Sequence, residues 1–387
     1  MTALLRPPPS PRHGGSSSTT SWCCRFLIII AVLAVAWMAL QQHQHHETET
    51  KHDAHEDHVL QRYHDPFSHD DRCTEDDDNA QPPQEQEAAQ SVVTEKKCHC
   101  PDPLVPLPRP DDQPEWQVHH QAQAQQVLEI ATETTNNANN NNHPLDVVFL
   151  GDSITERWRG TRSMGGEPVP EIRQVFDQYF GADADGSSNN NHTSTTQLRG
   201  LALATSGDIT VETAWHLDHG WWPTTNEPET MAHNFHPKVV VLLIGTNDLG
   251  RSGCSKRNVL VGILHVAEHL HQLQPNIPIL FHGLLPRAGG PNDDDNEDTN
   301  VNLQLGPFWD QIMWINRELR HLCKNHRHWY YMDSAKLFLA RNPENGELKI
   351  RPELLPDGLH PSLQGYQEWA PRLSQVVRRI MKHQLPG

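Results

Sequence analysis

The sequence from residue 144 to residue 387 predicts an α/β domain in which helices cover both faces of a parallel sheet. Three observations lead to this fold class. Apolar runs of strand length alternate with amphipathic stretches of helix length. Polar residues follow several of these strands abruptly, as they do at the edge of an open α/β sheet. Finally, about 240 residues is a reasonable size for one such domain.

The elements of this domain follow one another in a regular order. Five buried strands are predicted at Val147–Leu150, Leu201–Ala204, Val239–Ile244, Ile277–Phe281 and His328–Met332. Helices are predicted near 168–180, 210–219, 256–273, 307–326 and 362–383. Segments rich in Gly, Asn, Asp, Thr or Pro interrupt the pattern, and we expect them to form surface loops at 181–196, 221–236 and 287–304.

The composition of the whole chain is too polar for one uniform globule. Of its 387 residues, 36% are hydrophobic and 30 are proline, so we expect order to be concentrated in one part. Lys and Arg number 31 against 49 Asp and Glu, which gives a formal net charge of -18. We therefore expect no nucleic-acid partner, because binding to a nucleic-acid backbone needs a basic face.

The N-terminal region predicts a single membrane anchor. Residues 1–25 contain arginines and no acidic residue, and residues 26–40 form an unbroken apolar run. Positive charge before the span keeps the N-terminus cytosolic. We expect a cytosolic tail at 1–25, a transmembrane signal-anchor at 26–40 and a lumenal or extracellular domain in the secretory pathway, the Golgi or at the cell surface. The alternative is secretion after cleavage, but Trp37 and Met38 stand where a cleavage site needs small residues.

Residues 41–143 are predicted to form a disordered stalk before the domain. Glu, Asp, Gln, Asn, His and Pro dominate this segment, and its apolar residues show no sustained periodicity. Many histidines crowd its start, where they could bind divalent metal or sense pH. We favour a polar spacer, because the composition implies no fixed geometry. A helical piece over Val118–Thr134 is compatible with this interpretation.

Three further features bear on the environment and on the ligand. Asn191 begins an N-glycosylation sequon, which agrees with a lumenal domain. Cys254 and Cys323 are candidates for a disulfide in an oxidising lumen, although their spacing does not show whether they meet. Trp221 and Trp222 lie in an insert near the predicted active edge, where they could stack on a sugar or form a hydrophobic plug.

The first predicted strand runs directly into Gly151, Asp152 and Ser153. A serine in this place lies at the carboxyl edge of the sheet, where ligands bind in open α/β folds. It also opens a helix, whose free N–H groups favour an anion. A serine hydroxyl needs a base to become a good nucleophile. The tripeptide alone favours an N-cap serine that has no chemical role.

The second and third strands end in residues that could stabilise a negatively charged oxygen. Gly207 follows the second strand, and a glycine permits close approach and an exposed N–H. It could also be an ordinary turn glycine. Asn247 follows the third strand and offers a side-chain NH2 donor. Backbone N–H groups together with an Asn side chain are a common way to stabilise a developing oxyanion.

The base that the serine needs is predicted just before the last helix. Asp357 and His360 are three residues apart, so a short turn can bring their side chains together. Asp357 would fix the tautomer of His360, and His360 would take the proton of Ser153. Asp357 is the only aspartate of the chain with a histidine three residues later, which limits the risk of a chance pair.

These four blocks, taken in order, resemble those of the SGNH (GDSL-type) hydrolase superfamily. The matching blocks lie at 151–153, 207, 245–248 and 357–361. Additional residues resemble the catalytic subunits of the platelet-activating-factor acetylhydrolase Ib branch, at Ser206–Thr210, Trp215–Leu217, Pro237–Val239 and Gly283–Arg287. The resemblance covers roughly 144–383 and implies a three-layer α/β/α flavodoxin-like sandwich around a five-stranded parallel sheet.

The same resemblance implies roles for single residues. It implies that Ser153 is the nucleophile, His360 the general base and acid, and Asp357 the carboxylate that orients His360. The implied oxyanion hole consists of the N–H groups of Ser153 and Gly207 and the side chain of Asn247. The implied supporting residues are Asp152 in the serine turn and Gly245 in the block that contains Asn247.

The expected function is that of a serine esterase. It would remove a short acyl group, above all acetyl, from a glycan or lipid ester through an acyl-serine intermediate, with no metal or organic cofactor. The branch that the chain resembles is cytosolic, whereas this chain is predicted to be anchored, so acetylated glycans stay beside lipid esters as substrates. The resemblance also suggests a homodimer. The alternatives are a lumenal O-acetyltransferase that uses the same site and an inactive binding module, against which the complete residue set argues.

Overall fold

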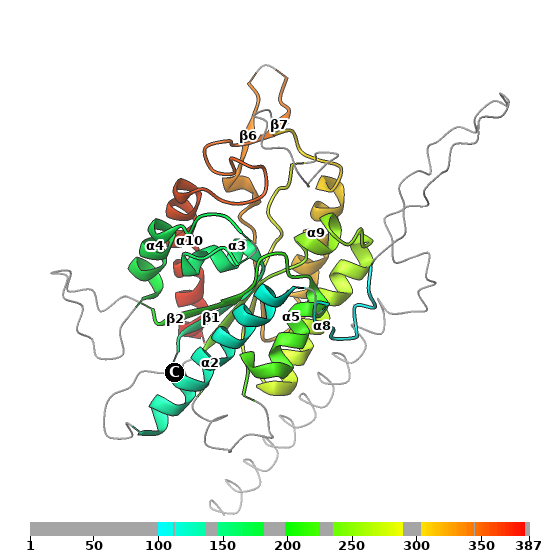
Figure 1. Ribbon diagram of the computed structural model, residues 1–387. Coiled ribbons are helices and arrows are strands. Elements are labelled where there is room, and N and C mark those ends of the chain that lie inside the picture. The colour runs from blue at the N-terminus through cyan, green and yellow to red at the C-terminus, as the bar shows by residue number, and fades with distance from the viewer. Residues whose placement is uncertain are drawn as a thin grey trace, which may run out of the picture. The chain divides into compact units, whose positions relative to one another are not determined.

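A computed structural model describes residues 100–110, 113–136, 145–163, 165–181, 198–223, 235–288, 303–343 and 345–383. All of them belong to one of the two compact units of the chain, Arg62–Gly387. Its core is a five-stranded parallel sheet (Figure 1). The strands are β1 (Val147–Gly151), β2 (Gly200–Ala204), β3 (Val239–Leu243), β4 (Ile279–His282) and β5 (Trp329–Met332). All five predicted strands are confirmed, with ends that differ by at most two residues.

The strand order β2-β1-β3-β4-β5 puts β1 between β2 and β3. In the register, Gly151 lies opposite Ala204 on one side and Leu243 on the other. β1 and β3 are buried along their whole length, which explains why they read as continuous apolar runs. Because the strands are parallel, the segments that follow β2, β1 and β3 all begin at one edge of the sheet.

Helices cover both faces of this sheet, as predicted. Figure 1 shows α4 (Pro170–Phe180) and α10 (Leu363–His383) on one side, and α5 (Thr210–His216), α8 (Lys256–Leu273) and α9 (Trp309–Leu322) on the other. The amphipathic pattern of α10 buries an apolar stripe that includes Trp369, Leu373 and Val377. The helix expected over 210–219 instead changes at His216 into a short π-helical segment, Leu217–Trp221.

Several short elements lie between these layers and were not predicted. α3 (Ser153–Glu156) and α7 (Thr246–Gly250) begin at the edge of the sheet, and the single turns are η2 (Arg157–Arg159) and η4 (Ala335–Leu337). β6 (Leu339–Arg341) and β7 (Leu348–Ile350) form an antiparallel hairpin. Gly346 in its loop has φ 73°, a left-handed conformation that glycine adopts readily.

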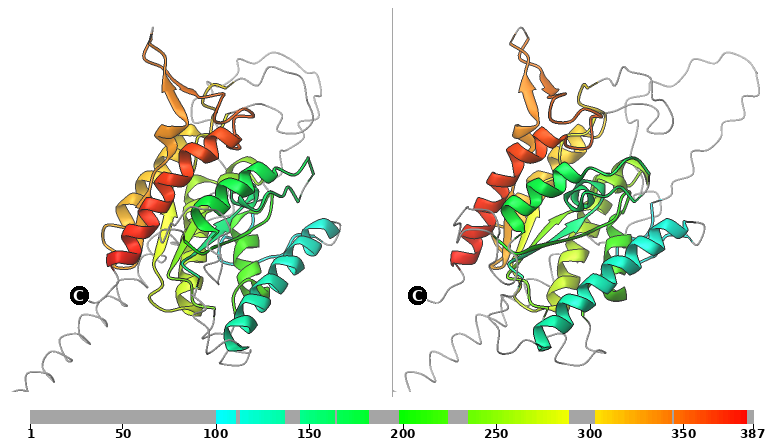
Figure 2. Two further views of the ribbon diagram at one scale, coloured as in Figure 1. Left: turned by 90° about the vertical axis from the view of Figure 1, so that its left-hand side faces the viewer. Right: turned by 60° about the vertical axis from the view of Figure 1, so that its left-hand side comes forward.

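The prediction of a disordered stalk over 41–143 is wrong for its C-terminal part. Residues 100–110 and α2 (Pro114–Asn136) belong to the folded domain, so the domain begins well before residue 144. Figure 2 shows α2, in cyan to green, beside the sheet and its flanking helices. Its buried positions follow a helical stripe that mixes apolar and polar side chains: Trp116, His120, Gln123, Val127 and Ala131. The polar members hide this stripe from a hydrophobicity pattern, and hydrogen bonds to the domain compensate their burial.

The expected disulfide between Cys254 and Cys323 is also wrong. Cys254 forms a disulfide with Cys100, 154 residues away in the sequence, and Cys323 is a free thiol. The reason is that Cys100 belongs to the domain and not to a disordered stalk. The disulfide therefore fastens the segment that begins at Cys100 to the loop after α7.

Of the two interpretations of the tryptophan pair, the structure supports the hydrophobic plug. Trp221 and Trp222 are 0% and 2% exposed. Trp221 stacks on His216 with ring centroids 3.9 Å apart, and Trp222 packs edge-on against Phe235 at 5.2 Å. Neither indole presents a free face to a sugar.

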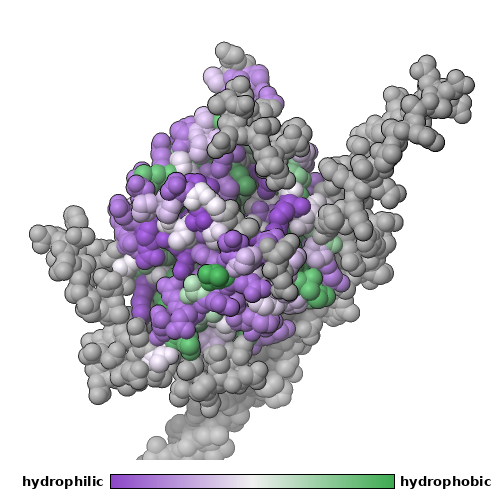
Figure 3. Space-filling model, viewed as in Figure 1, coloured by the Kyte–Doolittle hydropathy of each residue, from purple (hydrophilic) through white to green (hydrophobic). Residues whose placement is uncertain are grey.

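The remaining predictions fall outside the residues that the structure describes. These are the anchor at 26–40, the sequon at Asn191 and most of the three inserts. Among the described residues, no helix is long and apolar enough to cross a membrane. The face of the molecule in Figure 3 is mostly hydrophilic, and its hydrophobic patches are small and separate.

Candidate active site

Three loops meet where the neighbouring strands β2, β1 and β3 end. β1 leads into Asp152 and Ser153, β2 into Ser206 and Gly207, and β3 into the loop that carries Asn247. The parallel register aligns the ends of these strands, so the predicted nucleophile and both predicted oxyanion-hole loops start at one edge. This is the place where open α/β sheets bind their ligands.

Ser153 is the first residue of α3, and Asp152 is the N-cap residue. The Asp152 carboxylate accepts a hydrogen bond from the N–H of Ile154 at 3.0 Å, which is ordinary helix capping. The interpretation of Ser153 as the cap is therefore wrong, and its hydroxyl is available for another partner. Gly151, at the end of β1, allows the backbone to approach β3 closely. A Cβ at this position would lie 2.2 Å from the Leu243 carbonyl oxygen.

The Ser153 hydroxyl hydrogen-bonds to His360. Its Oγ lies 2.8 Å from His360 Nε2, although the two residues are 207 positions apart in the sequence. On the other side of the ring, His360 Nδ1 lies 2.8 Å from Asp357 Oδ2. The second oxygen of Asp357 accepts the backbone N–H groups of Leu359 and His360 at 3.0 and 2.7 Å. The three predicted residues thus form one continuous hydrogen-bonded chain with the geometry of a nucleophile, a base and an orienting carboxylate.

The electrostatic surroundings suit these roles. Burial lowers the pKa of His360 below its ordinary value. The positive charge of Arg157 lowers this pKa further, whereas Asp357 raises it in part. A base with a lowered pKa is neutral near pH 7 and can accept a proton. Burial alone would raise the pKa of Asp357, but the hydrogen bonds from His360 and Leu359 outweigh it and hold the pKa well below the usual range. Asp357 therefore remains a carboxylate.

Gly207 and Asn247 lie side by side at the same edge. Gly207 has φ 78°, a left-handed conformation in which a Cβ would be strained. The Asn247 side chain donates through Nδ2 to the Asp208 carbonyl oxygen at 2.9 Å, so one of its two N–H hydrogens remains for another acceptor. Gly245, with φ 122°, begins the turn into α7 that carries Asn247. The structure thus brings together the two residues, Gly207 and Asn247, that were predicted to donate to the oxyanion beside Ser153.

Two buried charged residues, Glu156 and Arg109, hold the loop around Gly207. The Glu156 carboxylate accepts hydrogen bonds from the Ser206 N–H at 2.7 Å and from the Ser206 hydroxyl. It also accepts the Ser163 N–H at 2.6 Å. From the other side, Arg109 Nη2 donates to the Ser206 carbonyl oxygen at 2.7 Å. Neither residue was predicted from the sequence, since Glu156 looks like a helix-surface residue and Arg109 lies in the segment that was predicted to be a stalk.

Asp208, the residue after Gly207, is the centre of a buried polar cluster. Its carboxylate pairs with Arg109 Nη2 at 3.0 Å and accepts the indole N–H of Trp116 at 2.8 Å. His216 Nε2 lies 3.1 Å from its second oxygen, and His216 Nδ1 lies 2.7 Å from His120 Nδ1. Complete burial raises the pKa of Asp208 to about 7 in spite of Arg109 and Trp116, and burial lowers the pKa of His120 to about 3. Burial also lowers the pKa of His216 well below its ordinary value, so both imidazoles are neutral partners in this cluster.

The Asn247 loop has its own buried supports. Asp248 accepts the Thr210 hydroxyl at 2.6 Å and the Thr210 N–H at 3.1 Å, which ties this loop to the start of α5. Arg287 donates to the Thr246 carbonyl oxygen at 3.1 Å. Burial raises the pKa of Asp152 to about 7, whereas Arg287 acts in the opposite direction. Arg287 belongs to the block at 283–287, for which the sequence predicted no individual role.

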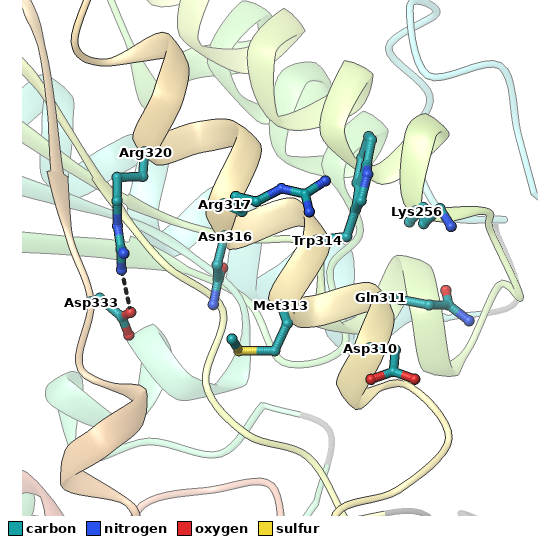
Figure 4. Close-up of a pocket in the computed structure, with 9 residues that line it drawn as sticks. All are labelled: Lys256, Asp310, Gln311, Met313, Trp314, Asn316, Arg317, Arg320 and Asp333. Carbon is teal, nitrogen blue, oxygen red and sulfur yellow. Dashed lines mark hydrogen bonds and ion pairs between the residues drawn. The ribbon is translucent and has the colours of Figure 1, made fainter.

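A separate cavity of about 410 Å³ lies along α9 (Figure 4). Its wall consists mainly of α9 residues from Asp310 to Arg320, together with Lys256 and Asp333, and Arg320 pairs with Asp333 at 2.7 Å. None of the predicted site residues lines it. Among the described residues there is also no group of three or more His, Cys, Asp or Glu side chains that could hold a metal ion.

Known proteins with similar sequences point to the same chemistry. Residues 149–368 match the GDSL-like Lipase/Acylhydrolase family. The platelet-activating factor acetylhydrolase IB subunit alpha1 of Bos taurus is 23% identical over 236 residues, which cover 61% of this chain and 76% of that protein. The alpha2 subunit of Gallus gallus is 30% identical over 160 residues, 41% of this chain and 52% of that protein. The chain thus spans about half the length of the alpha2 subunit, and the same holds for several further acetylhydrolase subunits that it matches.

Solved structures with a similar fold include two from microbes. A GDSL-like lipase of Bacteroides thetaiotaomicron has a TM-score of 0.42 at 18% identity, and the match covers 65% of this chain and 97% of that one. A carbohydrate esterase family 3 protein of Talaromyces cellulolyticus has a TM-score of 0.37 at 17% identity, with 62% and 99% covered. The family match includes more than half of the chain and contains both Ser153 and His360. The chain therefore belongs to the GDSL-like lipase/acylhydrolase family, whose members hydrolyse ester bonds.

Proposed function

We propose that this protein is a serine esterase that removes a short acyl group, above all acetyl, from a glycan or lipid ester. The observation that carries the proposal is the chain of two 2.8 Å contacts that links Ser153 Oγ to His360 and His360 to Asp357. Membership of the family supports the reaction class. The names of the relatives, which are acetylhydrolases, support a short acyl group.

In the first half of the reaction, Ser153 Oγ attacks the ester carbonyl carbon while His360 Nε2 accepts the hydroxyl proton. Asp357 stabilises the resulting imidazolium and keeps the ring oriented through Nδ1. The carbonyl oxygen becomes an oxyanion, which the N–H groups of Ser153 and Gly207 and the Asn247 amide stabilise. His360 then gives its proton to the departing alcohol oxygen, and an acyl-serine remains.

In the second half, water takes the place of the alcohol. His360 accepts a proton from the water as its oxygen attacks the acyl carbon, and the same donors stabilise the second oxyanion. Collapse of this intermediate returns the proton to Ser153 Oγ and releases the carboxylic acid. Apart from the ester and water, each step needs only the side chains and backbone groups named above.

The proposal is tested by hydrolysis of p-nitrophenyl esters from acetyl to octanoyl. We expect activity that falls steeply with chain length and that Ser153→Ala reduces by about 10⁴-fold or more. Ser374→Ala is a matched control, because Ser374 is also a buried serine but hydrogen-bonds only within α10, to the Pro371 carbonyl oxygen. Activity that survives in Ser153→Ala would contradict the assignment of the nucleophile.

We further propose that the domain works in an oxidising compartment, behind the predicted anchor at 26–40. The disulfide between Cys100 and Cys254 supports this location, because such bonds persist in secreted and lumenal proteins and are rare in the cytosol. Non-reducing peptide mapping of the native protein should find the two cysteines linked. Free thiols at both positions would contradict the proposed compartment.

A further inference from the structure

The loop of Ser206, Gly207 and Asp208 is held at nearly every polar atom. The Ser206 N–H and hydroxyl donate to Glu156, and the Ser206 carbonyl oxygen accepts from Arg109. The Asp208 N–H donates to the Thr205 carbonyl oxygen at 3.1 Å, and the Asp208 carbonyl oxygen accepts from the Asn247 amide. Among the described residues, no acceptor takes the N–H of Gly207. The loop therefore fixes its backbone and leaves one donor for a ligand.

Arg109 contacts each of the three residues of this loop with one side chain. Its guanidinium is 2% exposed and donates to the Ser206 carbonyl oxygen at 2.7 Å and to Asp208 Oδ1 at 3.0 Å. Its Nε lies 3.2 Å from Glu212 Oε2. A Cβ placed on Gly207 would lie 3.1 Å from Arg109 Nη2, so the guanidinium also packs directly against Gly207. Arg109 thus touches the residues on both sides of Gly207 and Gly207 itself.

The segment that carries Arg109 is anchored on both sides of it. We call residues 100–110 and 113–136 the N-terminal strap. Before Arg109, the disulfide from Cys100 and a hydrogen bond from the Leu107 N–H to the Val211 carbonyl oxygen, 3.2 Å long, attach the strap to the domain. After it, Trp116 donates to Asp208. Both anchors place Arg109 against the loop independently of the catalytic triad.

Gln123 continues this attachment to the end of β2. Its side-chain oxygen accepts the Ala204 N–H at 2.7 Å, and its side-chain nitrogen donates to the Ala204 carbonyl oxygen at 3.0 Å. The strap therefore pairs with β2 where the strand ends, three residues before Gly207. A surface helix that needed only an apolar contact would not require this match to the backbone.

We propose that Arg109 is a positioning residue for the oxyanion hole, and that the N-terminal strap is part of the esterase site because it carries Arg109. The proposal rests on the proposed function and deepens it. Arg109 holds the carbonyl oxygen of the peptide group that carries the Gly207 N–H, together with the Asp208 carboxylate beside it, so that this donor points at the developing oxyanion without rearrangement. Preorganised donors of this kind account for a large share of catalysis, and small displacements of them are costly.

The chemistry of arginine explains why this residue type occupies the site. A guanidinium presents several N–H donors in a fixed planar fork, so it can hold a carbonyl oxygen and a carboxylate at once. A lysine ammonium would keep the charge beside Asp208 and Glu212 but could not reproduce the fork. Arg109→Lys therefore separates the positioning role from the need for a positive charge in the buried cluster.

The test compares Arg109→Lys with wild type in the full chain. We expect kcat for p-nitrophenyl acetate to fall about 10- to 100-fold with KM changed by no more than about twofold, since the donor acts on the transition state. Arg159→Lys is the matched control, because Arg159 also donates to a backbone carbonyl oxygen, that of Ala202 in β2 at 2.5 Å, but makes no hydrogen bond to the Gly207 loop. A normal kcat in a folded Arg109→Lys protein would overturn the proposal.

Two additions keep the test decisive. Trp116→Phe keeps an aromatic side chain but removes the indole N–H that donates to Asp208, so it should lower kcat a few-fold even if Arg109→Lys does not fold. An unchanged kcat in Trp116→Phe would then overturn the proposal. The rate at which a fluorophosphonate labels Ser153 is measured in the same proteins, because its phosphoryl oxygen occupies the oxyanion hole without any ester substrate. If wild type labels but hydrolyses no ester, the proposed function fails, and the labelling rates still test Arg109.

Discussion

The nucleophile side and the oxyanion side of this site are built in different ways. The nucleophile side consists of three side chains, Ser153, His360 and Asp357, and the Asp357 side chain is 46% exposed. The oxyanion side consists of backbone groups around Gly207 together with Asn247, and the charged groups behind it are buried, with Asp208 0% exposed. One side reaches towards solvent, and the other is enclosed.

The difference follows from what each side must do. A base must change its protonation state during the reaction, so His360 benefits from a hydrogen-bonded partner and from access to solvent. An oxyanion hole acts only if its donors are already in place, so its loops need rigid supports. Buried hydrogen bonds supply that rigidity, and here they come from α3, α5 and the N-terminal strap. We therefore expect substitutions on the two sides to differ in how much kcat and how much stability they remove.

The largest effect is expected for Asp357→Asn on the nucleophile side. The amide would favour the wrong tautomer of His360, and kcat should fall by about 10⁴-fold. Because nearly half of the Asp357 side chain is exposed, the unfolding temperature should change little. Asp333→Asn is the control, since Asp333 pairs with Arg320 and hydrogen-bonds to none of the three triad residues. Equal activity of the two variants would show that Asp357 does not orient the base.

The next effect is expected for Asn247→Ala on the oxyanion side. Loss of this donor should lower kcat about 10²- to 10³-fold with little change in KM. The substitution also removes the hydrogen bond to the Asp208 carbonyl oxygen, so some stability is lost. Asn316→Ala controls for that loss, because Asn316 is a buried amide that bridges the N–H and carbonyl of Leu284. If both variants lose kcat alike, Asn247 has only a structural role.

Gly207→Ala should give a smaller effect that separates strain from catalysis. The substitution places a Cβ at φ 78° against Arg109, so kcat should fall about tenfold. Gly346→Ala imposes a similar strain at φ 73° in the β6–β7 loop, where the nearest atom is 3.9 Å away. Both should lose about 1–2 kcal/mol of stability. A tenfold loss of kcat in Gly346→Ala as well would attribute the effect to stability alone.

The amount that the sequence predicts differs between the same two sides. The residues of the nucleophile side lie in short local patterns: Ser153 directly follows a strand, and Asp357 and His360 share one turn. The strands were predictable because a sheet covered on both faces needs continuous apolar runs. On the oxyanion side, Gly207 and Asn247 were found for the same reason, because each follows a strand.

The supports of the oxyanion side were not predictable from local patterns. The buried stripe of α2 contains His120 and Gln123, whose burial is compensated only by partners some 80 to 100 residues away, at Ala204 and His216. A composition window therefore assigns the segment to a stalk. The disulfide from Cys100 to Cys254 was not predicted, because Cys100 was assigned to the stalk and because spacing does not show which cysteines meet.

The smallest effect is expected in the pH dependence. The rate should fall on the acid side as His360 becomes protonated, with a midpoint below 6.5 because the pKa of His360 is lowered. Burial is the main cause, and Arg157 adds to it, so Arg157→Gln should move the midpoint upward. Arg173→Gln, an exposed residue paired with Asp177, should leave it unchanged. A midpoint that stays the same in Arg157→Gln would exclude this contribution.

The central claim is that Ser153 is the activated nucleophile of this site. The most direct measurement is the mass of the full chain after reaction with a fluorophosphonate, followed by mapping of the modified peptide. We predict one adduct, on Ser153, formed at a rate that drops sharply in Asp357→Asn and absent in Ser153→Ala. An adduct on another residue, or an equal rate in the Asp357→Asn protein, would contradict the account.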